Sequence, residues 1–90
     1  MKRSDALYNW LQIRVVLDER PDDLSAQDTE SFFKQILVED HKLNMLTYVR
    51  EELHYVLTYV TEEGPKETKF DRDAVELLLT AIQAEPKYAE

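Results

Sequence analysis

Residues Leu43–Val60, LNMLTYVREELHYVLTYV, carry apolar side chains at steps of three and four: Leu46, Val49, Leu53, Val56 or Leu57, and Val60. This spacing places side chains on one face of an α-helix. A second row, Tyr48, Tyr55 and Tyr59, would flank that face with amphipathic rings. The stretch therefore predicts the central helix of an all-α fold, a small bundle of about four helices.

The second half of this stretch also fits a strand. Residues 55–60 are almost entirely β-branched or aromatic, a composition that favours strands. A turn at residues 62–66 and a return strand at 68–70 would give the alternative, an α+β fold with a short hairpin near residues 54–70. An isolated two-stranded hairpin is marginal in water. Because the helical spacing also runs longer than the alternation, we expect the helix.

Three further helices are expected around the central one. Their ranges are Ser4–Arg20, which Pro21 ends, Ser25–Asp40, and a last helix that Asp71 caps and Pro86 ends. A bend near residues 41–44 separates the second helix from the central one. Ninety residues suffice for one domain. We therefore expect a single helical domain over residues 1–90, in which residues 86–90 form a loose tail.

The first helix is unusually apolar. Between Ala6 and Leu17 only Asn9, Gln12 and Arg14 are polar. A helix with so narrow a polar stripe is buried on several sides. Two explanations stay open: this helix is the most central one of the bundle, or self-association covers it.

The charge of the chain excludes some classes of partner. Nineteen acidic residues against eleven basic ones give a formal net charge of −8. Binding to a nucleic-acid backbone depends on clustered Lys and Arg, and anionic lipid surfaces repel such a protein. The chain has no cysteine, and no run reaches the roughly 18 apolar residues of a membrane span. We expect a cytoplasmic acidic protein that binds neither nucleic acid nor membrane directly.

No motif predicts an enzyme. Glu51 and His54 form one Glu-x-x-His unit, whereas ferritin-like di-iron bundles use two such units and further glutamates. A salt-bridge neighbour on the helix explains a single unit without any metal. Gly64 is the only glycine, too few for a phosphate-cradling loop. The expectation is a protein with no catalytic residue, no cofactor and no metal.

The aromatic residues are the candidate partner-binding residues. Tyr and Trp are enriched in protein interfaces because they bury a large area and keep a polar tip. The predicted partner-binding set is Tyr8, Trp10, Tyr48, Tyr55 and Tyr59. The alternative is that these rings pack inward at the edge of the core, with their hydroxyl groups reaching water.

The predicted function is that of a small acidic helical protein–protein interaction module with a regulatory or adaptor role. Its partner is another protein or a second copy of itself, in a homodimer. The alternative is an acidic decoy or inhibitor that occupies a basic protein surface, for example one that binds nucleic acid, which the charge of −8 suggests. Binding of the second kind weakens steeply as salt rises, because salt screens long-range attraction.

Overall fold

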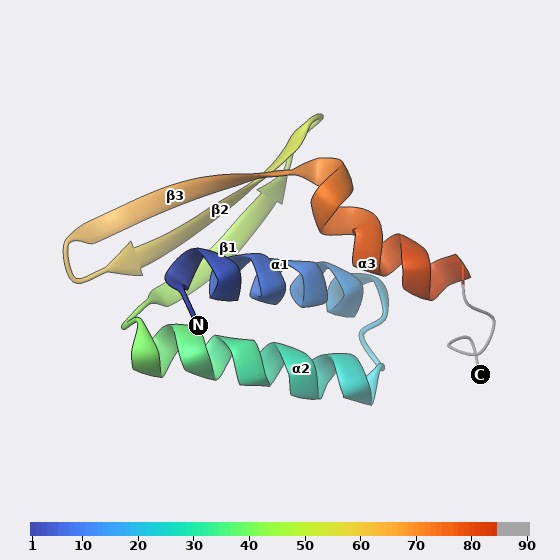
Figure 1. The fold of residues 1–90 in the computed structure, drawn as a ribbon, viewed down its shortest axis with the longest axis horizontal. Helices are drawn as coiled ribbons and strands as arrows, with labels where there is room; N and C mark the ends of the chain where they lie inside the picture. The colour runs from blue at the N-terminus through green and yellow to red at the C-terminus, as the bar shows by residue number, and fades with distance from the viewer. Residues whose placement is uncertain (85–90) are drawn as a thin grey trace.

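The computed structural model describes residues 1–84, and the tail expected at residues 86–90 lies outside this range. Within it the chain forms helices and strands in the following order (Figure 1): α1 (Arg3–Glu19), α2 (Leu24–Gln35), the π-helical turn η1 (Ile36–Asp40), β1 (Asn44–Arg50), β2 (His54–Thr61), β3 (Gly64–Asp71) and α3 (Arg72–Ala84).

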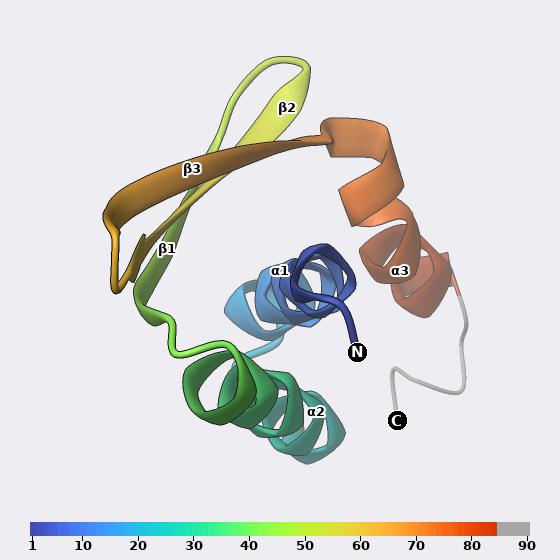
Figure 2. The same cartoon turned by 60° about the vertical axis from the view of Figure 1, so that its left-hand side comes forward.

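The strands form one antiparallel sheet in the order β1-β2-β3, and the helices lie on one side of it. Figure 2 shows α1 at the centre, with the sheet on one side of it and α2 and α3 on the others. Both α2 and α3 pack against α1. The fold is therefore a two-layer α+β arrangement, with a three-stranded sheet over a layer of helices.

The predicted all-α bundle is wrong. The stretch Leu43–Val60 forms β1 and β2 and contains no helix. Its inward-facing residues alternate along the strands, as in Tyr55, Leu57 and Tyr59, which are all buried. The alternative, an α+β fold with a hairpin near residues 54–70, describes β2 and β3, which pair from His54 opposite Asp71 to Thr61 opposite Gly64.

Two sets of contacts explain why strands form here. The hairpin is not isolated, because β1 adds a third strand on the other side of β2, with Val49 opposite Val56. The turn between β1 and β2 has neither glycine nor proline. Arg72 at the start of α3 holds it, donating from its backbone N–H to the Leu53 carbonyl (3.0 Å) and from Nη1 to the Glu52 carbonyl (3.1 Å).

The helix α1 is the centre of the core. Eight of its residues are buried: Ala6, Leu7, Trp10, Leu11, Ile13, Val15, Val16 and Leu17. The sheet, α2 and α3 cover them from different sides, as Figure 2 shows. Two explanations were open for the apolar sequence of α1, and the structure agrees with the first. The helix α1 is the most central helix, and the chain itself covers it.

The helix ends follow the sequence with one difference. The bounds of α1 lie within one residue of those predicted. The last helix begins after Asp71, whose Oδ2 accepts from the Ala74 N–H at 3.0 Å and thus confirms the predicted cap. The second helix begins at Leu24, one residue earlier than predicted, and Asp23 caps it, since Asp23 Oδ1 accepts from the Ala26 N–H at 3.0 Å.

Replacing the Asp23 cap of α2 should lower the stability of the protein measurably. We expect Asp23→Ala to lower the free energy of unfolding by about 0.5–2 kcal/mol, because the Ala26 N–H loses its acceptor. That hydrogen bond, followed by Arg20, lowers the pKa of Asp23. Its contribution is therefore present above the ordinary value of 3.8 and is lost as the pH falls through the lower folded value. Urea unfolding with Asp22→Ala as the control tests this, and equal losses in both variants would contradict it.

Candidate functional site

The structure places the five predicted partner-binding residues in or beside the core. Trp10, Tyr55 and Tyr59 are buried, and Tyr8 and Tyr48 are half-buried. Their polar atoms have partners within the chain: Tyr8 Oη donates to the Ala74 carbonyl, Trp10 Nε1 to Glu30, Tyr48 Oη to Asp18 and Tyr55 Oη to Glu76, and Tyr59 Oη bonds Thr68 Oγ1. The rings thus pack inward, but their tips bond protein groups rather than water. Of the five, only Tyr48 lies on a strand at the edge of the sheet.

That edge is β1, which pairs with β2 on one side only. The Glu51 N–H donates to the His54 carbonyl at 2.7 Å, which sets the alternation of the antiparallel ladder. In that alternation the backbone groups of Thr47 and Val49 point toward β2. The backbone groups of Tyr48 and Arg50 point away from β2, toward the open edge, where another strand can pair with them.

The two edges of the sheet differ in how they are protected. The outer strand β3, GPKETKFD, carries Pro65, Lys66, Glu67 and Lys69, residue types that discourage pairing with another chain. In contrast, β1 has no charged residue from Asn44 to Val49. In a protein with a net charge of −8 this is an unusual strand to leave at an edge. A β-bulge between Asn44 and Thr47 interrupts only its first half.

A groove runs beside the open edge, between β1 and the helices α1 and α2. It has a volume of about 720 Å³, and its lining includes Trp10, Glu30, Lys34, Leu46 and Tyr48. Glu30 is only 8% exposed, and its Oε2 accepts from Trp10 Nε1 at 2.8 Å. The groove therefore offers apolar surface, a buried carboxylate and the open backbone of a strand side by side.

Several apolar residues on the outer face of the sheet are exposed to solvent. The helices lie on the other face, as Figure 2 shows. Met45 and Val49 of β1 are 74% and 61% exposed, and Leu53 in the following turn is also exposed. In the regular part of the strand Thr47 and Val49 alternate with Tyr48, and they face outward next to the open edge.

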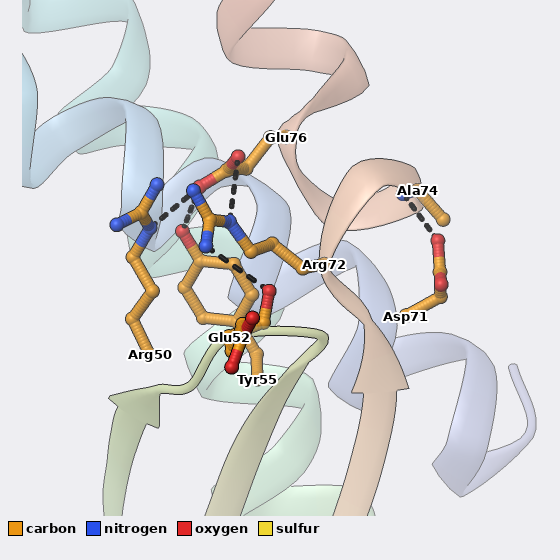
Figure 3. Close-up of polar contacts among 7 residues, drawn as sticks. All are labelled: Arg50, Glu52, Tyr55, Asp71, Arg72, Ala74 and Glu76. Carbon is orange, nitrogen blue, oxygen red and sulfur yellow. Dashed lines mark hydrogen bonds and ion pairs between the residues drawn. The ribbon is translucent and has the colours of Figure 1, made fainter.

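A polar network closes the opposite end of the sheet against α3 (Figure 3). Glu76 accepts from Tyr55 Oη at 2.5 Å, from Arg50 Nε at 2.9 Å and from Arg72 Nε at 3.5 Å. The Tyr55 hydrogen bond, followed by Arg50 and Arg72, lowers the pKa of Glu76 against the effect of burial. Neither Glu76 nor Arg72 was assigned a role from the sequence. The network holds the β1–β2 turn against α3.

Ionisation of the Tyr55 hydroxyl group should lower the free energy of unfolding at alkaline pH. Burial, followed by the hydrogen bond to Glu76, raises the pKa of Tyr55 to about 12 from 10.0. The stabilisation that this shift represents is fully present below about pH 10 and is lost as the pH rises through about 12. Urea unfolding of wild type and Tyr55→Phe at pH 7 and pH 11 tests this, because the variant lacks the ionising group. The same loss between the two pH values in both proteins would contradict it.

Glu51 and His54 do not share a helix face. They flank the β1–β2 turn, where they are joined through their backbones. Over residues 1–84 the structure brings together no group of three or more histidine and acidic residues that would hold a metal ion. No helix in the same range is long and apolar enough to cross a membrane. Comparison of the chain with protein-family models, with curated proteins and with solved structures found no match.

Proposed function

We propose that this protein is a small acidic protein–protein interaction module that binds an extended segment of another chain at the open edge of β1. The observation that supports this most directly is the contrast between the two edges of the sheet. Proline and charged residues protect β3, whereas β1 is uncharged from Asn44 to Val49 and lies beside a groove.

Strand addition suits the groups that β1 presents. The backbone N–H and carbonyl groups of Tyr48 and Arg50 are available to hydrogen-bond an incoming strand. Alternate side chains of that strand would enter the groove beside Leu46 or lie next to Val49 on the outer face. Backbone hydrogen bonds would provide affinity and the groove would provide selectivity, in a regulatory or adaptor role that needs no catalytic residue.

The acidic-decoy alternative is motivated by the net charge of −8 alone. It needs carboxylates gathered on one surface. The pairs Glu51–Glu52 and Glu62–Glu63 lie in the turns at opposite ends of β2. The net charge of −8 raises the encounter rate with basic segments but does not select one surface. We therefore place binding at the β1 edge.

A peptide selection tests this function. A displayed library of random peptides is selected on the wild-type protein, and the enriched peptides are measured against Val49→Lys and Leu77→Lys. Val49 and Leu77 are 61% and 64% exposed, on β1 and on α3, so the two variants add the same charge at matched exposed sites. Selected peptides should lose about tenfold or more in affinity for Val49→Lys and keep it for Leu77→Lys.

Two results would contradict the proposal. One is that no peptide is enriched over a bare support. The other is that enriched peptides bind the two lysine variants equally. In the supporting case, the peptide should also shift the amide signals of Leu46–Arg50 in isotope-labelled protein, with smaller shifts in β3.

A further inference from the structure

We propose that the strand that adds to β1 is β1 of a second copy of the chain, which gives a symmetric homodimer. This inference rests on the proposed function, because it uses the same open edge. Each copy would contribute its three strands to one continuous sheet through an antiparallel β1–β1 junction. Such a junction has two-fold symmetry, the commonest symmetry of soluble homo-oligomers.

The open part of the strand fixes the register of this junction. The regular ladder of β1 runs from Thr47 to Arg50, after the bulge. A two-fold axis at Tyr48 lets the largest part of this ladder pair with the second copy. The axis places Tyr48 opposite Tyr48 of the second copy and Leu46 opposite Arg50 of the second copy. Tyr48 and Arg50 are the positions at which the regular ladder points backbone groups outward. The central Tyr48 pair would make two backbone hydrogen bonds, and the outward groups of each Arg50 would face the other strand.

The charges around β1 suit antiparallel self-pairing. Residues Leu43–Val49 are uncharged, so the negative charge of one copy does not directly face that of the other in the centre of the junction. Lys42 precedes the strand, and Glu51 and Glu52 follow it. Antiparallel pairing brings the basic beginning of one β1 next to the acidic end of the other, where diagonal neighbours are within reach of long side chains.

The second copy would also add a guanidinium to the groove, which Arg14 and Lys34 of the chain itself already line. Leu46 lines the groove together with Glu30, and Arg50 of the second copy lies opposite Leu46 on the same face of the sheet. Glu30 is buried, its Oε2 accepts from Trp10 Nε1, and its charge also acts on Arg14 in the same groove. Arg50 is exposed enough to turn toward this groove. Without Arg50, Glu76 would still accept hydrogen bonds from Tyr55 and Arg72. A buried carboxylate and a guanidinium would then meet across the junction.

The second copy would also cover outward-facing residues of β1. In this register Val49 lies opposite Thr47 of the second copy, in a non-hydrogen-bonded pair, where side chains approach closely. The outward-facing Thr47 and Val49 of the two copies would then lie next to each other. Part of the exposed apolar surface of each copy would be covered by the other.

Sedimentation equilibrium of the purified full-length protein tests the dimer. From about 5 µM to about 1 mM, wild type should change from monomer to dimer. We expect Val49→Lys and Glu30→Gln each to raise the dimer dissociation constant by about tenfold or more, and Leu77→Lys to leave it within about twofold. Circular dichroism should show the same fold for all three variants. A monomer throughout this range, or equal losses in Val49→Lys and Leu77→Lys, would overturn the inference.

Cysteine cross-linking tests the register, and the chain has no cysteine of its own. Thr47→Cys mixed with Val49→Cys should form an intermolecular disulfide, because these residues lie opposite each other in the junction. Thr47→Cys alone should cross-link far less. In this register the two copies of Thr47 are about 8 Å apart, beyond the roughly 7 Å that a disulfide spans without backbone movement. Equal cross-linking of the mixture and the single variant would overturn the register.

The outcomes separate this inference from the proposed function. A strictly monomeric protein whose selected peptides still depend on Val49 would end the dimer and leave strand addition in place. A second outcome is a dimer whose dissociation constant Val49→Lys leaves unchanged and in which Thr47→Cys and Val49→Cys do not cross-link. It would place self-association on another surface and overturn the inference.

Discussion

Leu11→Ala is expected to lower the free energy of unfolding by about 2–5 kcal/mol, the usual cost of truncating a fully buried leucine. Leu11 has no exposed surface and lies in the cluster that joins α1 to Leu57 of β2. A domain of this size has a total stability of about 5–15 kcal/mol, so the change removes a large share of it. Urea unfolding followed by circular dichroism measures the difference.

The control is the same substitution on the surface. Leu77 of α3 is largely exposed, and Leu77→Ala should change the free energy of unfolding by no more than about 0.5 kcal/mol. If the two leucines cost the same, α1 is not the centre of the core.

Glu76→Ala should cost about 1.5–3 kcal/mol, the range for hydrogen bonds to a charged group. The substitution leaves the Tyr55 hydroxyl group and the Arg50 guanidinium without their shared acceptor. Glu62→Ala, in the exposed β2–β3 turn, is the control and should be nearly neutral.

The effect of Glu76→Ala should also depend on pH. Because the folded protein holds the pKa of Glu76 below its ordinary 4.5, the carboxylate contributes stability above that value. This contribution is lost as the pH falls through the lower folded pKa. The difference between wild type and Glu76→Ala should therefore shrink in acid, and a difference that grows as the pH falls would contradict the network.

The helices could be predicted from the sequence because their signals are local. The end of α1 is set by Pro21, and the beginning of α3 by the Asp71 cap. The strands β1 and β2 could not be separated from a helix in this way. The apolar residues of Leu43–Val60 satisfy both periodicities, and the turn that divides them has no glycine or proline. Arg72, about twenty residues away in sequence, holds that turn through the Glu52 carbonyl.

The open edge of β1 could not be predicted for the same reason. Chemistry alone selected the rings of Tyr8, Trp10, Tyr55 and Tyr59, and the fold places these rings in or beside the core. Tyr48 belongs to the open edge, which exists only once β1 is recognised as a strand. One signal was available: the uncharged run Leu43–Val49 stands out in an acidic chain. Read with a period of two, it is an unprotected edge strand.

Backbone amide exchange along β1 tests the central claim most directly. In dilute protein, the amides of Tyr48 and Arg50 should exchange quickly because they face the open edge, while those of Thr47 and Val49 are protected by β2. At high protein concentration, or with a saturating selected peptide, Tyr48 and Arg50 should become protected as well. If neither condition slows their exchange, the edge of β1 does not accept another strand.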